Sequence, residues 1–405
     1  MGKVIVFCAD GTWNGPGEPD DDDKTAPASN VFKLFLNLAG TDTPDTYQLE
    51  KEQERVLLDS ATNSVFQCAK YIHGVGDSDN WLVKTLGGSL GAGLITRIVR
   101  GYTFISRNYE KNDKIFIAGF SRGAYTARAL AGLIAAEGLL DASKINLTDK
   151  KIAYQLGSAV WYRWRRTTLA HDAGWLGKLE ETIIDIPGLF TAAPNPDVML
   201  HTDIESVSVW ETVGALGIPE YTRNQARLDV FRFADIKLNP VIRYGLHAVA
   251  VDERREDFTP TLWETDPRVT QVLFPGAHAD VGGGYPNGKE SGLSDGALIW
   301  MINKLATLGV NFLPLSPKDV TPAPKDVTPD ACATAHEPWA HGIFATLAQG
   351  PRVFPTGLYL SQSVLNRMAC GNVVPDPSAP ASAYVPTNLA GYVVDGKSAP
   401  EVKIC

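Results

Sequence analysis

The sequence predicts an α/β protein with a mostly parallel central sheet, helices on both faces and an inserted helical cap. Strand-like and helix-like patterns alternate through the first third of the chain, which is typical of parallel sheets with crossover helices. A β-branched and aromatic run at 114–118 leads through a serine between two glycines straight into an alanine-rich helix pattern. The 405 residues, of which 44% are hydrophobic, suffice for one elaborated domain over 1–405.

The first elements can be assigned in chain order. We expect a strand over 4–8, a helix over 30–38 capped by Asn30, strands over 55–58 and 71–75, and a helix from the glycine cluster at 87–93 through residue 109. The glycine cluster lacks the spacing and the preceding strand of a dinucleotide-binding loop. Its glycines are expected to let the helix approach the sheet closely.

Residues 141–205 interrupt this alternation with clustered aromatic and arginine residues, including the run at 159–166 and Trp175. The segment lies where a lid or cap is inserted, and its 155–180 part is a candidate wall for an acyl chain. Its helix either contacts a lipid surface or packs its tryptophans on the core. A proline-rich surface loop is expected over 314–330, and a loop-rich wrap with one helix near 361–368 over 331–405.

Charge and composition exclude several classes of protein. A net charge of −9 argues against a nucleic-acid partner, because such domains carry a basic face. The first apolar run is too short for a signal peptide, and no apolar run of 18 residues is present. The five cysteines are scattered and odd in number, which predicts a reduced, cytoplasmic origin and gives no metal signature.

The segment Gly119-Phe-Ser121-Arg-Gly123 has the pattern of a nucleophile elbow. The turn from strand to helix raises the serine hydroxyl above the sheet, and Cβ atoms at either glycine would clash where strand and helix cross. The backbone N–H of Arg122 can then face a developing oxyanion. An ordinary βα turn would not explain both glycines.

A serine hydroxyl needs a base, and α/β hydrolases place serine, acid and histidine in that chain order. Of seven histidines, His278 follows the strand-like run at 271–275 and precedes a triple glycine. His247 is the alternative base, although its apolar surroundings favour a core histidine. Glu211, at the end of the strand-like run 207–210, is the expected acid, with Asp280 and Asp252 as substitutes.

The second oxyanion donor is expected in the loop after the first strand, from the amide of Gly11 or Thr12. Asp10 would orient this loop as an Asx-turn residue. Asp10 could instead bind calcium with the acidic run 20–23, but that run is better explained as a solvated loop. Asp280 is more readily explained as a turn cap that holds the triple glycine. No cofactor and no metal are expected.

Four ordered segments carry a resemblance: Asp10-Gly-Thr-Trp-Asn14, the elbow at 119–128, Val209-Trp-Glu-Thr-Val-Gly214, and 276–285 with His278. They resemble a family of α/β-hydrolase-like domains, long of unknown function, that includes phospholipase effectors of the bacterial type VI secretion system. The resemblance implies an α/β-hydrolase fold and a serine esterase or lipase. The chain departs from the family at Glu211, where aspartate is usual.

The expected activity is hydrolysis of carboxylic esters, of lipids or phospholipids in particular, by Ser121, His278 and Glu211. Partners would be a lipid or small ester, a membrane surface without a spanning segment, and a secretion or immunity protein. Export without a signal peptide and a housekeeping cytoplasmic role both fit the sequence. The alternatives are a non-catalytic binding scaffold and an acyl hydrolase for thioester or peptide bonds.

Overall fold

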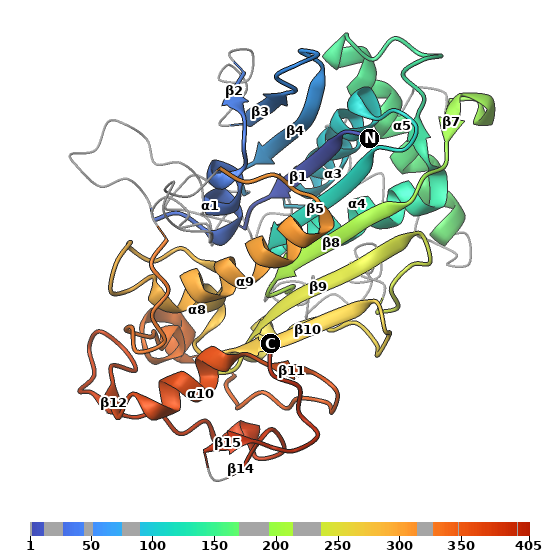
Figure 1. Ribbon diagram of the computed structural model, residues 1–405. Helices are drawn as coiled ribbons and strands as arrows, with labels where there is room; N and C mark the ends of the chain where they lie inside the picture. Colours follow the sequence, from blue (N-terminus) through green and yellow to red (C-terminus); the bar gives the residue numbers. More distant parts are fainter. Residues whose placement is uncertain are drawn as a thin grey trace.

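A nine-stranded sheet forms the centre of the molecule (Figure 1). The computed structural model describes residues 2–11, 27–43, 52–74, 90–169, 194–213, 236–313, 327–346, 348–394 and 396–405. The strands are, in spatial order, β11 (Tyr359–Leu360), β10 (Val269–Phe274), β9 (Ile242–Ala250), β8 (Ile204–Trp210), β5 (Lys114–Phe120), β1 (Val4–Ala9), β4 (Val65–Ile72), β3 (Gln53–Leu58) and β2 (Thr41–Asp42). Neighbours from β11 to β4 pair in parallel, whereas β3 and β2 form an antiparallel edge. The predicted mixed α/β fold with a largely parallel sheet is confirmed.

Helices cover both faces of this sheet. Successive side chains of each strand point to opposite faces, and both faces carry apolar side chains that the helices bury. On one face, Ile5 and Phe7 of β1 pack in a cluster with α3 (Leu90–Asn108), α4 (Arg122–Glu137) and α5 (Lys150–Leu169). On the other face, Val4 and Val6 pack with α1 (Asn30–Asn37) and α9 (Gly292–Leu308). Figure 1 shows α1 and α9 on the side of the sheet away from α3 and α5.

The predicted helix over 30–38 is present, but its cap is Ser29 and not Asn30. The Ser29 hydroxyl accepts the N–H of Phe32, at 3.1 Å. The Asn30 side chain instead donates to the carbonyls of Val281 and Ser294, at 2.8 Å each, and so ties α1 to the later chain.

The described part of the predicted cap segment packs on the core. In α5, Trp161 and Trp164 are buried in the cluster that α3 and α4 form against the sheet. The short antiparallel pair β6 (Leu139–Leu140) and β7 (Met199–Leu200) closes this region. Trp175 and the rest of 170–193 lie outside the described residues, so the cap over 141–205 stays a prediction.

The C-terminal segment packs against the β10 edge of the sheet, where Leu360, Val364 and Leu389 are buried together with Leu273. It contains α10 (Gln362–Ala369), which begins after Ser361 as the sequence predicts. Two short antiparallel pairs follow, β12 (Asn372–Val373) with β13 (Ser382–Ala383) and β14 (Val393–Val394) with β15 (Lys397–Ser398). None of the helices in the described ranges is long and apolar enough to cross a membrane.

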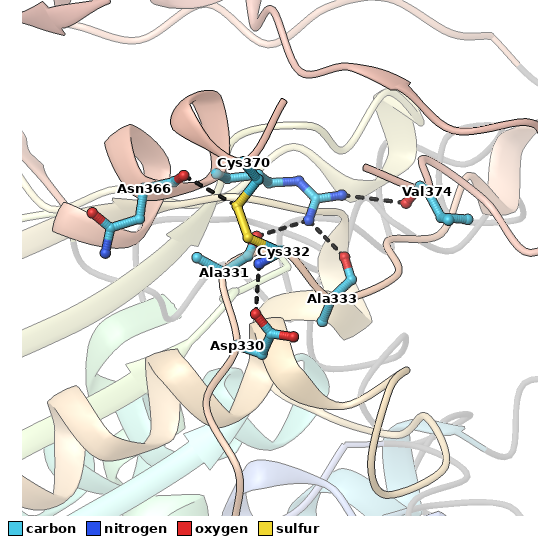
Figure 2. The surroundings of a disulfide bond; sticks show 8 residues. Asp330, Ala331, Cys332, Ala333, Asn366, Cys370 and Val374 are labelled. Atoms are coloured by element: carbon cyan, nitrogen blue, oxygen red, sulfur yellow. Dashed lines mark hydrogen bonds between the residues drawn. A yellow bond between two sulfur atoms is a disulfide. The ribbon is translucent and has the colours of Figure 1, made fainter. Parts of the chain in front are cut away.

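A disulfide joins Cys332 to Cys370, 38 positions apart (Figure 2). The prediction of a fully reduced chain was therefore wrong for these two cysteines, whose pairing sequence spacing alone does not indicate. Cys8 and Cys68 are free and buried, and Cys405 is free and half-buried.

The strand order places the ends of β1 and β5 at a topological switch point. From β1 the chain goes to β4 on one side, and it then returns to β5 on the other side. Crossover connections leave such neighbouring strands in opposite directions, which opens a crevice at their carboxyl ends. Ser121 follows β5 and Asp10 follows β1, so both predicted site segments lie at the carboxyl ends of these two adjacent strands.

Candidate active site

Ser121 lies in a strained turn between β5 and α4, with φ 55° and ψ −119°. A Cβ on Gly119 would lie 2.3 Å from the carbonyl oxygen of Gly123, and a Cβ on Gly123 would lie 2.1 Å from that of Ala9. Both glycines are therefore required by close backbone approach, as the sequence predicts. The Ser121 side chain makes no capping hydrogen bond to α4.

Glu211 and His278 form a hydrogen-bonded pair, with 2.8 Å between Glu211 Oε2 and His278 Nδ1. Glu211 directly follows β8, and His278 opens the short helix α8 (His278–Gly282) after β10. Both side chains are buried, and the imidazole ring lies 4.8 Å from the ring of Phe120, the residue before Ser121. The fold thus brings the expected acid and base together beside the elbow.

Backbone strain is concentrated at this site. Among the residues that the structure describes, four non-glycine residues have a positive φ: Asn63, Asn112, Ser121 and Glu211. Asparagine adopts this conformation readily, whereas serine and glutamate do so at a cost of about 1–3 kcal/mol. The two strained residues follow neighbouring parallel strands, β5 and β8.

Arg352 binds the other side of Glu211 and was missed by sequence reasoning. Its Nη1 donates to Oε1 and its Nη2 to Oε2 of Glu211, both at 2.9 Å. The N–H of Ala250, at the end of β9, also donates to Oε1, at 2.7 Å. Nothing in the loop-rich sequence around Arg352 distinguishes it from a surface arginine.

A family model matches most of the chain. Residues 3–304 match the family described as the type VI secretion system phospholipase effector Tle1-like catalytic domain. The chain belongs to this Tle1-like family. An uncharacterized protein of Saccharomyces cerevisiae, YEL023C, is 24% identical over 272 residues, which are 67% of this chain and 34% of that protein.

Two solved structures are similar to the Tle1-like chain at low identity. One is the Tle1 effector bound to the VgrG spike of the type 6 secretion system, with 18% identity, a TM-score of 0.38, and coverage of 71% of this chain and 52% of that one. The other is an uncharacterized protein from Pseudomonas aeruginosa, with 16% identity, a TM-score of 0.42, and coverage of 78% and 48%. The chain spans about a third of the yeast protein and about half of each of these two chains.

The electrostatics of the Tle1-like site keep the acid ionised and the base neutral. Burial by itself raises the pKa of Glu211, but Arg352 and the hydrogen bond from His278 outweigh it and hold that pKa well below its usual range. Burial lowers the pKa of His278 below 6.5, and Glu211 opposes this effect only in part. At neutral pH the imidazole is therefore unprotonated and able to accept a proton.

The alternative base, His247, is a core histidine. It is fully buried in β9, and its Nε2 accepts the backbone N–H of Thr212, at 3.2 Å. Burial lowers its pKa to about 3. Because that nitrogen's lone pair is already engaged, His247 is poorly suited to deprotonate a serine.

The two substitute acids are engaged elsewhere. Asp280 accepts the N–H of Ala277, at 2.9 Å, and pairs with Nδ1 of His336, at 2.7 Å. Asp252 accepts the N–H of Gly276, at 2.6 Å, and the hydroxyl of Tyr384, at 2.9 Å. Asp280 therefore caps the start of α8 by accepting the N–H of Ala277, upstream of the triple glycine that it was expected to hold. Glu211 is the carboxylate that contacts the imidazole of His278.

Asp10 is buried directly after β1 and joins Gly11 to α1 and β4. Its carboxylate accepts the N–H of Gly11 at 2.6 Å, the hydroxyl of Ser29 at 2.7 Å and the hydroxyl of Tyr71 at 2.6 Å. The Gly11 amide is thus engaged by Asp10. Thr12 and the acidic run 20–23 lie outside the described residues.

A second carboxylate–arginine pair supports His278 from the other side, and it also escaped sequence reasoning. Glu253 accepts the backbone N–H of His278, at 3.2 Å. Arg255 donates to both oxygens of Glu253, at 2.8 and 2.7 Å, and stacks on the ring of Phe258. Phe258 in turn contacts the imidazole edge-on, with ring centroids 5.0 Å apart. Backbone and ring of His278 are therefore both held.

Proposed function

We propose that this Tle1-like chain is a serine esterase that cleaves acyl esters of lipids, phospholipids in particular. Membership of a phospholipase effector family supports hydrolysis of lipid esters. The observation that carries the serine mechanism is the buried His278–Glu211 pair beside the strained elbow of Ser121. The chain order of these three residues is the one that α/β hydrolases use, which supports assignment to that fold class.

In the proposed mechanism, Ser121 Oγ attacks the ester carbonyl. Because Nδ1 of His278 is bound to Glu211, Nε2 is the nitrogen that accepts the serine proton. The same nitrogen returns the proton to the leaving alcohol, and water then hydrolyses the acyl-enzyme. One oxyanion donor is the N–H of Arg122, the residue after the nucleophile. Asp10 engages the N–H of Gly11, and the alternative second donor from the sequence, Thr12, lies outside the described residues.

The proposed biological setting follows from the family. As a type VI effector, the protein would be made in the cytoplasm and exported through a spike protein without a signal peptide, with an immunity protein in the producing cell. The Cys332–Cys370 disulfide suits an oxidising compartment at the destination, because disulfides persist there and are rare in reduced cytoplasm.

Hydrolysis of nitrophenyl esters and of phospholipid vesicles by wild type and Ser121→Ala tests this function. Loss of a triad nucleophile should lower kcat by several orders of magnitude. Ser158→Ala is a matched control, because that buried hydroxyl donates to the carbonyl of Tyr154 within α5. Equal activity of wild type and Ser121→Ala would refute the serine mechanism, and absence of turnover in wild type would favour a binding scaffold.

A further inference from the structure

The segment that follows the family match reaches into the site. The match ends at residue 304, whereas Arg352 lies within the loop that the Cys332–Cys370 disulfide closes. This loop places a buried guanidinium on the carboxylate of Glu211, with two hydrogen bonds of 2.9 Å. The acid of the site is therefore held by two different parts of the chain.

We propose that Arg352 is a positioning residue for the esterase: it fixes the carboxylate of Glu211 in the orientation that holds His278. This inference rests on the proposed function and deepens it. Arg352 does not touch the reacting atoms in this scheme. It acts through Glu211, whose contact with Nδ1 decides which nitrogen of His278 faces the serine.

The geometry of the guanidinium supports this role. Beyond Glu211, Nη1 donates to the carbonyl of Ala250, at 2.7 Å, and Nη2 to that of Phe258, at 2.5 Å. Arg352 thus links the carboxylate to the backbone on two sides, at the end of β9 and beside the ring that contacts His278. A planar fork with two parallel bonds fixes carboxylate rotation in a way that a single donor does not.

Glutamate needs this restraint more than aspartate does, because its side chain has one more rotatable bond. Oε1 of Glu211 is held by Arg352 and by the N–H of Ala250. Oε2 is held by Arg352 and by His278. Removing Arg352 would leave one hydrogen bond on each oxygen and would free the carboxylate to change its angle to the imidazole.

Charge gives Arg352 a second effect, on proton binding by the His278–Glu211 pair. Among the described residues, the other charged groups that act most on the pKa of His278 are Arg255, which lowers it, and Glu253, which raises it. These two pair with each other and leave little net charge. His247, near Glu211, is neutral above about pH 3. Arg352 is therefore the cation that balances Glu211, and without it the pair would bind a proton at higher pH.

The loop that carries Arg352 is anchored independently of the site. The Cys332–Cys370 disulfide joins its two ends, as Figure 2 shows. The guanidinium of Arg367, in α10, donates to the carbonyls of Ala331, Ala333 and Val374. Arg367 is buried like Arg352 but contacts backbone instead of the Glu211 carboxylate, which makes it a matched control.

The test compares Arg352→Met, Arg352→Lys and Arg367→Met in the full chain. Two readouts are needed: the pH profile of kcat/KM on a nitrophenyl ester, and the titration of the His278 imidazole by NMR. Arg352→Met should lower kcat/KM about 100-fold at neutral pH, the scale of a displacement of about 1 Å at a reacting group. The acidic limb of the pH profile of this variant and the midpoint of its His278 titration should both move to higher pH, by about one unit or more.

The other variants separate positioning from folding. Arg352→Lys should bring the acidic limb back toward wild type, because it restores the charge, while kcat stays low, because an ammonium lacks the planar fork. Arg367→Met should lower stability without moving the limb. The inference would be overturned if, in Arg352→Met, His278 titrates at the same pH as in wild type and kcat/KM is unchanged. Because NMR needs no turnover, an inactive wild type would refute the proposed esterase while the titration still decides the role of Arg352.

Discussion

Gly123→Ala tests the elbow by a single added carbon. The new Cβ would lie 2.1 Å from the carbonyl oxygen of Ala9 and 2.5 Å from that of Asp10. An ordinary C···O contact is about 3.3 Å, so backbone must move by about 1 Å. Overpacking of this kind costs about 1–3 kcal/mol of the free energy of unfolding. It also displaces Ser121 from the loop after β1, which should lower kcat/KM about 100-fold.

Gly132→Ala is the matched control, because it makes the same change in the same helix, α4. Its Cβ would lie 3.3 Å from the side chain of Trp164, which requires a shift of a few tenths of an ångström. A gain of about 1 kcal/mol in helix propensity offsets this contact. Urea unfolding and ester hydrolysis measure both variants. If Gly123→Ala equals Gly132→Ala in stability and activity, the close approach at the elbow is not what requires the glycine.

Three further outcomes are expected. Glu211→Asp draws the carboxylate back by about 1.5 Å and should lower kcat about 100-fold at unchanged fold; steady-state kinetics with a circular dichroism check measures this, and a wild-type kcat would contradict it. Burial raises the pKa of Asp10 from 3.8 to about 7, so the folded state binds the proton more tightly and the free energy of unfolding should fall as the pH rises from about 4 to about 7. Asp10→Asn should remove that fall in urea titrations at pH 5 and pH 8, and an unchanged slope would exclude Asp10 as its source. Cys332→Ser with Cys370→Ser opens a loop of 38 positions and should cost about 4 kcal/mol in the chain-entropy model; equal thermal unfolding of this variant and of the oxidised wild type would argue against a stabilising disulfide.

Local patterns predicted the parts of the fold that local chemistry controls. The strand and helix around Ser121 follow from a β-branched run, two glycines and an alanine-rich run, and they lie at Lys114–Phe120 and Arg122–Glu137. The pattern at 55–58 gave a strand but not its direction, which depends on pairing with β4. The cap at Asn30 was misplaced by one residue because Ser and Asn are both good caps, and the second role of Asn30 depends on residues about 250 positions away.

The residues of the site likewise fall into those that a local pattern locates and those that depend on distant packing. Ser121, His278 and Glu211 each end or follow a strand, so a motif and a strand pattern could locate them. Arg352 and the Cys332–Cys370 pair could not be found in this way, because their partners come from the packing of the C-terminal segment on the β10 edge. Glu253 and Arg255 follow β9 in a run of charged residues that is typical of a solvated turn. Both are buried, because Glu253 binds the backbone of His278 in α8 and Arg255 packs on Phe258 and Phe344.

Glu211 and Arg352 are best understood together. The side chain of Glu211, longer than that of aspartate by a methylene, starts from a strained backbone, with φ 48°, and reaches both His278 and the N–H of Ala250. The extra methylene costs side-chain entropy when it is fixed. Arg352 offsets that cost with two charge-assisted hydrogen bonds to the same carboxylate. Glu211 and Arg352 lie 141 positions apart in the chain and meet only in the folded protein. Exchanging Glu211 for aspartate without rebuilding the contact with Arg352 would therefore leave the acid too short to serve both His278 and Arg352.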